Sequence, residues 1–100
     1  MEKRSPHCPL GKVKTLVKAG KVRATASAYQ GARELGIDTL SGMCTVVLSL
    51  APAQFYKSMT TQADLRIWQD VYRGETTDGA GVYVKLTVID DLLIVSFKEL

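Results

Sequence analysis

The segment that most restricts the fold lies at the C-terminal end of the chain, where residues 81–100 read GVYVKLTVIDDLLIVSFKEL. Apolar and polar side chains alternate on both sides of Asp90-Asp91, and a period of two residues is typical of a β-strand with one buried face. Two such runs around a short polar turn predict an antiparallel hairpin. One face of this hairpin is almost wholly apolar, so we expect it to form the floor of a core.

A two-residue loop at Asp90-Asp91 defines which side chains lie opposite each other in the hairpin. In that register Tyr83 lies opposite Lys98 on the face away from the core, where directly opposed Cβ atoms are roughly 4.5–5.5 Å apart. Lys85 lies one step along the same face. A longer loop is the alternative, because Asp-Asp is not a preferred pair for a tight turn. The expected core face holds Val82, Val84, Leu86, Val88, Leu93, Val95 and Phe97, and the opposite face includes Thr87, Ile94 and Ser96.

Residues 9–20 and 27–35 have the pattern of two helices. Pro9 suits a first helical position and Gly20 suits the residue just past the end. The apolar side chains between them recur at helical spacing and leave the opposite side basic. Two candidate capping hydroxyls precede the second helix, and Gly36 follows it.

The middle of the chain predicts two more helices. One is expected over residues 39–50, although the β-branched run CTVVLSL within it also suits a buried strand. Pro52 favours a short fourth helix over residues 52–59, in which Lys57 points away from the apolar side chains.

The rest of the chain has the signals of strands and turns. Residues 66–73, RIWQDVYR, alternate in type and predict a strand, whereas residues 74–81, GETTDGAG, predict a loop. Helices first and strands last indicate an α+β fold, in which N-terminal helices cover one face of a C-terminal antiparallel sheet. With 100 residues and 46% apolar content, the chain is expected to form a single domain over residues 1–100.

Basic residues are concentrated in the first third of the chain. Residues 1–33 hold eight Lys and Arg against one acid, which is +7, and residues 34–100 hold five against nine, which is −4. The two parts together give the formal net charge of +3. A basic half on a small domain indicates a polyanionic partner or an acidic protein partner, and charge alone leaves a solubilising surface as the alternative.

Cysteine and histidine are too few to indicate a metal site. Cys8 and Cys44 are far apart in the sequence, and a cytosolic chain usually keeps such thiols reduced. His7 is the one histidine, so no cluster of metal ligands is expected. The apolar runs are too short for a bilayer, and the start, MEKRSPHCPLGK, lacks the apolar run of a signal peptide. We therefore expect a cytoplasmic protein.

Five segments resemble one family of bacterial toxins. They are MEKRSPH, GMC at 42–44, FYKSMTT, IWQDVYR and GVYVKLTVIDDLLIVSFKE, and the likeness extends over nearly the whole chain. The family is that of the motility quorum-sensing regulator (MqsR) toxins. The resemblance implies a messenger-RNA endoribonuclease with a fold similar to the RelE and YoeB toxins. It also implies cleavage at GC-containing triplets such as GCU, and neutralisation by a cognate MqsA-like antitoxin that itself binds zinc.

The resemblance further implies four catalytic residues, namely a lysine in FYKSM, a glutamine in IWQDVY, a tyrosine in the penultimate strand and a lysine in SFKE. In this chain they are Lys57, Gln69, Tyr83 and Lys98. The hairpin register brings Tyr83 and Lys98 together independently of the family. By itself, however, a Tyr–Lys pair on a sheet surface is usually packing plus solvent exposure. The chain departs from the family pattern at the hairpin turn, in the loop 74–80 and in the segment QADLR before Ile67, but not at the four positions.

Cleavage of RNA without a metal uses the RNA's own 2′-hydroxyl to attack the adjacent phosphorus, and it leaves a 2′,3′-cyclic phosphate. The enzyme must align the attack, transfer protons and offset charge in the transition state. A single histidine cannot form a histidine pair, and acids do not cluster outside the hairpin turn. We therefore expect Lys57 and Lys98 to bind phosphate oxygens. Tyr83 is the expected proton-transfer group, Gln69 orients the substrate, and no cofactor is expected.

Other residues and a second class of function stay open at this point. The further candidate RNA contacts are Lys85, Arg23 and Arg73, with Arg66 as another surface cation. The aromatic candidates for base stacking are Tyr56, Trp68 and Tyr72. Strand parity places Trp68 and Tyr72 opposite to Gln69, so at least one of them is expected in the core. The competing function is a non-catalytic regulatory module that binds nucleic acid or an antitoxin.

Overall fold

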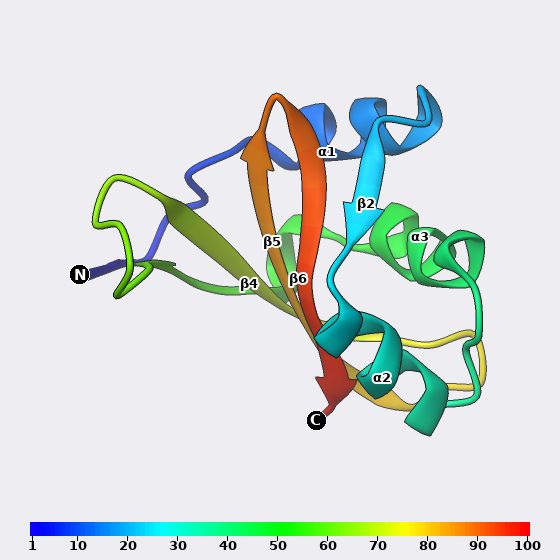
Figure 1. Ribbon diagram of the computed structural model, residues 1–100. Helices are drawn as coiled ribbons and strands as arrows, with labels where there is room; N and C mark the ends of the chain where they lie inside the picture. Colours follow the sequence, from blue (N-terminus) through cyan, green and yellow to red (C-terminus); the bar gives the residue numbers. More distant parts are fainter.

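The computed structural model describes residues 1–100 and contains one six-stranded sheet. The strands are β1 (Glu2–Lys3), β2 (Val22–Ala24), β3 (Phe55–Thr60), β4 (Trp68–Glu75), β5 (Gly81–Ile89) and β6 (Asp91–Glu99). The helices are α1 (Leu10–Lys18), α2 (Ala26–Glu34) and α3 (Leu40–Ser49). The sheet order is β1-β3-β4-β5-β6-β2, and every neighbouring pair is antiparallel except β2 with β6 (Figure 1). The chain is therefore α+β, as predicted.

The three helices begin and end where local chemistry favours it. The hydroxyls of Thr25 and Thr39 each accept a hydrogen bond, at 3.0 Å, from a backbone N–H in the first turn of α2 and α3. Gly20 follows α1 with a φ of 74°, a left-handed conformation that glycine adopts without strain. The three helices predicted from the first fifty residues are confirmed, and the alternative of a strand at CTVVLSL is wrong. None of the helices is long and apolar enough to cross a membrane.

The fourth helix predicted over residues 52–59 is wrong. Only Pro52–Gln54 form a 3₁₀ turn, and the chain then continues as β3, which pairs with β4. Alternation along β3 buries Ser58 and Thr60 on one face and leaves Lys57 on the other. The run FYKSMT becomes a strand because its aromatic and hydroxyl side chains suit a paired, half-buried ribbon, and this pairing outweighs the helical spacing.

The strand predicted over residues 66–73 is confirmed as β4, although β4 begins and ends slightly later. Both β4 and β5 extend into the segment 74–81 that was expected to be a loop. The remaining turn, residues 76–80, is closed by a hydrogen bond of 2.8 Å from the Thr76 N–H to the Ala80 carbonyl.

The β5–β6 hairpin combines a tighter turn than predicted with a bulge. Asp90 alone forms the turn, with a φ of 64°, and Ile89 pairs with Asp91. Leu86 therefore pairs with Ile94, one residue away from the expected Val95. The register then shifts between Lys85 and Leu86, which restores the predicted partners beyond it, namely Lys85 with Ser96, Val84 with Phe97, and Tyr83 with Lys98.

This shift changes which residues near the turn are buried. Leu92 and Ile94 are fully buried, whereas Leu93 and Val95, which were expected on the core face, are only half-buried. The extra residue of the bulge, Val95, explains the difference, because one inserted residue exchanges the faces of a strand. The sequence pattern alone does not reveal it, since residues 92–95 are all apolar.

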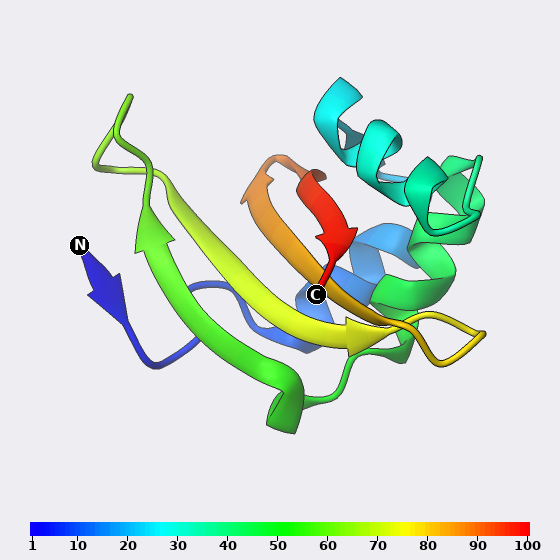
Figure 2. The same ribbon diagram turned by 90° about the horizontal axis from the view of Figure 1, so that it is seen from below.

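The buried face of the sheet packs against the helices. The core comprises Val13, Val17, Ala28, Ala32, Met43, Val46, Val47, Leu50, Tyr72, Val82, Val84, Leu86, Leu92, Ile94 and Phe97. Figures 1 and 2 show the helices gathered beside β2, β5 and β6, whereas β3 and β1 extend away from them. On the opposite face, which we call the outer face, Gln69, Tyr83 and Lys85 are half-buried.

Asp70 ties the N-terminal segment to the sheet. Its side chain is almost fully buried and accepts hydrogen bonds from the backbone N–H groups of His7 and Cys8, both at 3.0 Å. A third hydrogen bond comes from the Ser58 hydroxyl at 2.6 Å. A buried carboxylate is tolerated when its oxygens are satisfied in this way. Asp70 therefore joins residues 7–8, β3 and β4 in one polar anchor.

We expect Asp70→Ala to lower the free energy of unfolding by about 2–4 kcal/mol, because it leaves three donors without their acceptor. Urea denaturation followed by circular dichroism measures the change. Asp78→Ala, at an exposed position in the 76–80 turn, is the matched control and should change stability by less than about 0.5 kcal/mol. Equal stability of the two variants would contradict the anchoring role.

Candidate functional site

The four residues expected to be catalytic lie on four neighbouring strands. Lys57 is on β3, Gln69 on β4, Tyr83 on β5 and Lys98 on β6. Pairing places Met59 beside Gln69 and Tyr83 beside Lys98, and alternation turns all four candidate side chains to the outer face.

A depression of about 250 Å³ on the outer face brings three of the four candidates together. It is lined by Tyr56, Lys57, Met59, Val71, Tyr83, Lys85, Ser96 and Lys98, and we call it the lysine depression. Lys85, predicted as an RNA contact, is among these residues. Gln69 is not, although its strand neighbour Met59 is, so Gln69 lies at the border of the depression.

Lys57 is held by an acid that the sequence does not indicate. The Glu2 carboxylate lies 2.6 Å from the Lys57 Nζ, and the two strands that carry them are paired. This hydrogen bond, and then the opposite charge, raises the pKa of Lys57 and lowers the pKa of Glu2 from their ordinary values. A two-residue strand at the N-terminus has no recognisable pattern, which explains why Glu2 is not apparent from the sequence.

Lys85 lies between two other ammonium groups. Burial, followed by the positive charges of Lys98 and Lys57, lowers the pKa of Lys85 below that of an ordinary lysine. The depression is therefore a place where positive charge is only partly compensated. An anion placed there would interact with several cations at once.

Arg73 adds a guanidinium beside the depression. Its Cζ lies 3.8 Å from the centre of the Tyr56 ring and 5.7 Å from that of Tyr83, and the two tyrosine rings are 6.5 Å apart. Stacking on an aromatic face holds the guanidinium flat and leaves its N–H groups free at the edge. Arg73 is thus brought to the site.

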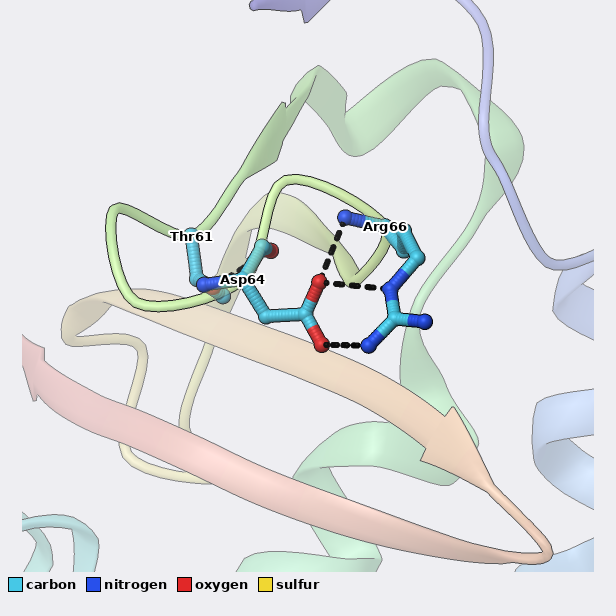
Figure 3. A network of polar contacts seen from close by, with 3 residues as sticks. All are labelled: Thr61, Asp64 and Arg66. Carbon is cyan, nitrogen blue, oxygen red and sulfur yellow. Dashed lines mark hydrogen bonds and ion pairs between the residues drawn. The ribbon is translucent and has the colours of Figure 1, made fainter.

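The other two candidate arginines, Arg23 and Arg66, lie elsewhere. Arg23 is exposed on β2, at the far side of β6, and does not line the depression. Arg66, in the β3–β4 loop, forms two hydrogen bonds of 3.1 Å with the Asp64 carboxylate, which in turn lies in a loop closed by Thr61 (Figure 3). The hydrogen bonds from Arg66 lower the pKa of Asp64.

Two of the aromatic candidates are on the wrong face for this site. Tyr72 is 1% exposed, and burial raises its pKa to about 12. This confirms that at least one of Trp68 and Tyr72 is core. Trp68 stacks with His7 at a ring distance of 5.7 Å and lies 4.2 Å from the Nζ of Lys3. Tyr56 is therefore the one of the three that lines the depression.

The two thiols do not take part in the depression. Cys8 and Cys44 are unpaired, and burial raises the pKa of each. A raised pKa keeps a thiol protonated and unreactive at neutral pH. Both side chains pack against the core. No group of three His, Cys, Asp or Glu side chains in the structure could hold a metal ion.

Comparisons with known proteins agree on the class. The mRNA interferase toxin MqsR of Escherichia coli (strain K12) is 59% identical over 99 residues, which are 99% of this chain and 99% of the relative. A family model described as motility quorum-sensing regulator, toxin of MqsA, matches residues 5–99. The fold and the cationic outer face thus belong to a protein of the toxin class. The chain is a member of the motility quorum-sensing regulator family of toxins.

The contact between Glu2 and Lys57 makes a specific prediction. Glu2→Gln should lower the pKa of Lys57, because the negative charge that stabilises its ammonium form is removed. Side-chain ¹⁵N NMR of labelled lysine, followed as a function of pH, measures the change. Glu99→Gln removes the same charge from β6 and should leave the Lys57 titration as it is. An unaltered Lys57 pKa in Glu2→Gln would show that the contact does not persist in solution.

Proposed function

We propose that this chain is a cytoplasmic endoribonuclease toxin that cleaves messenger RNA without a metal ion. The observation that carries the proposal is the lysine depression, where Lys57, Lys98 and Tyr83 meet on an uncovered sheet face. The relative that is 59% identical is named an mRNA interferase toxin, which supports the same activity. We also propose that the α+β arrangement is the fold of the RelE and YoeB toxins.

The proposed reaction is attack by the 2′-hydroxyl of RNA on the adjacent phosphorus, with departure of the 5′-oxygen. Lys57 and Lys98 bind the oxygens of the scissile phosphate as point charges, and Arg73 adds a guanidinium from the side. Tyr83 lies opposite Lys98 and transfers a proton to or from the reacting oxygens. Gln69, at the border, orients the 2′-hydroxyl or a phosphate oxygen.

Glu2 has a defined place in this scheme. In the free protein its carboxylate occupies the hydrogen-bonding position on Lys57 that an RNA phosphate would take. Both partners are at the surface, so water screens the pair and substrate can displace the carboxylate at modest cost. Glu2 thus holds the Lys57 ammonium in place until phosphate arrives.

The finer features of the proposal come from the family resemblance. We propose cleavage at GC-containing triplets such as GCU, and neutralisation by a cognate MqsA-like antitoxin that holds zinc in its own chain. The family model is described as the toxin of MqsA, which supports the existence of such a partner.

The activity is tested by incubating the purified protein with a defined RNA in EDTA. We expect cleavage with 2′,3′-cyclic phosphate ends, and a loss of roughly 10²–10³-fold in single-turnover rate for Lys57→Ala, Gln69→Ala, Tyr83→Phe and Lys98→Ala. Lys14→Ala, on α1, is the control for a general loss of positive charge. Intact RNA with a mobility shift would contradict the proposal and would favour the non-catalytic binding module.

The lowered pKa of Lys85 predicts how RNA binding depends on pH. Burial and the neighbouring cations disfavour the ammonium form of Lys85. The pKa of Lys85 is therefore lower than that of an ordinary lysine, which is about 10.4. A bound phosphate favours the charged form, so a 2′-deoxy substrate analogue should raise the pKa of Lys85. As the pH rises, the affinity of the wild-type protein for RNA should consequently fall at a lower pH than the affinity of Lys85→Arg, whose guanidinium stays charged. Side-chain NMR with and without the analogue measures the pKa, and an unchanged value would contradict contact with the phosphate.

A further inference from the structure

A helix, and not another strand, covers the second half of β6. Parallel pairing with β2 ends at Ala24, after which Thr25 donates its N–H to the Ile94 carbonyl at 3.1 Å and its hydroxyl to the Val95 carbonyl at 2.8 Å. α2 then runs along the remaining edge of β6 (Figures 1 and 2). A Cβ at Gly31 would lie 1.9 Å from the Phe97 carbonyl oxygen, so the helix backbone touches the strand.

This contact forms a groove of about 240 Å³ between α2 and β6, which we call the α2 groove. It has no hydrophobic lining residue, and its walls are Ser27, Gln30, Gly31, Glu34, Ser96 and Lys98. Two of these, Ser96 and Lys98, also line the lysine depression. The groove and the depression are therefore neighbouring sites that share a wall.

Glu34 gives the groove a distinct chemistry. It is the last residue of α2, where the helix dipole disfavours a carboxylate. The two ion pairs of the structure are Glu2–Lys57 and Asp64–Arg66, so Glu34 forms none. Its side chain is exposed, and Ser27, Gln30 and Glu34 share one helix face along the groove. Glu34 is the one carboxylate among the residues that line the groove, and its oxygens are free to accept hydrogen bonds there.

We propose that the α2 groove is a subsite for the nucleobase next to the scissile phosphate, and that Glu34 selects guanine there. This inference rests on the proposed ribonuclease function. A carboxylate repels phosphate, so the part of RNA that fits beside Glu34 is a base. The Watson–Crick edge of guanine presents two adjacent donors, N1–H and the N2 amino group, which match the two carboxylate oxygens. Uracil presents a single N–H between two carbonyl oxygens, which the carboxylate repels. Single-stranded RNA is commonly read on this edge.

The position of the groove supports this assignment. Phosphate held by Lys98 in the depression leaves the adjoining nucleotide at the shared wall, within reach of α2. Gln30, whose side-chain amide has two N–H donors and one carbonyl oxygen that accepts, is placed to contact the same base or its neighbour. Glu34 is thus a specificity-determining residue that takes no part in the bond-breaking step.

The test uses an oligonucleotide with one ribonucleotide in a 2′-deoxy background, which fixes the scissile phosphate. The base on either side of it is guanine or inosine, which lacks the N2 amino group. We expect wild type to cleave the guanine substrate about 10-fold faster, in kcat/KM, at one of the two positions, because one hydrogen bond to a charged acceptor is lost. Glu34→Ala should reduce this ratio to about 1, whereas the control Glu75→Ala should keep it.

A wild-type ratio of 1 at both positions, or a full ratio in Glu34→Ala, would overturn the proposal. If the wild-type protein cleaves neither substrate, the proposed ribonuclease function is wrong. The guanine subsite is then tested separately, by measuring the Kd of the guanine and inosine oligonucleotides with fluorescence anisotropy and comparing their ratio in wild type and Glu34→Ala. If Glu34→Ala keeps the guanine-to-inosine ratio of wild type but binds the antitoxin more weakly, the groove binds a protein partner, and the proposal of a base subsite is overturned. Glu34 is exposed, so the variant is expected to fold.

Discussion

The pairing of β5 with β6 is the constraint on which both the core and the candidate site depend. Successive side chains of a strand point to opposite faces of the sheet. A shift of one residue in the β5–β6 register would therefore move the core side chains of a strand to the outer face. The turn at Asp90 introduces such a shift, and the bulge at Val95 reverses it. As a result, Ile94 faces the helices near the turn, whereas Lys98 stands beside Tyr83 at the other end. One strand thus contributes to the core and to the outer face at once.

The features that the sequence predicts are those with local causes. Three helices, the α+β class and the Tyr83–Lys98 pair follow from spacing, caps and alternation within short segments. The features it does not predict depend on distant partners. β3 becomes a strand because β4 is available to pair with it, and Glu2 meets Lys57 because β1 pairs with β3. The bulge at Val95 cannot be recognised from the sequence, because residues 92–95 are all apolar and show no alternation that a bulge would interrupt.

The outer face gathers more positive charge than folding alone would favour. Lys57, Lys85 and Lys98 line one depression, and Glu2 compensates Lys57 alone. The lowered pKa of Lys85 reflects the remaining repulsion together with burial. Such repulsion costs stability in the free protein and is relieved when an anion binds. This distribution of charge is the one that the proposed phosphate site requires.

The edge of β6 shows how one structural solution creates a second surface. An uncovered strand edge invites unwanted pairing, and here a helix covers it. The helix can lie this close only because Gly31 has no side chain, since a Cβ would collide with the Phe97 carbonyl. The close approach places the polar side of α2 beside the lysine depression, because Ser96 and Lys98 line both the depression and the α2 groove. Any larger residue at position 31 would move α2 outward and widen the groove, so edge protection and the shape of the proposed base subsite are inseparable.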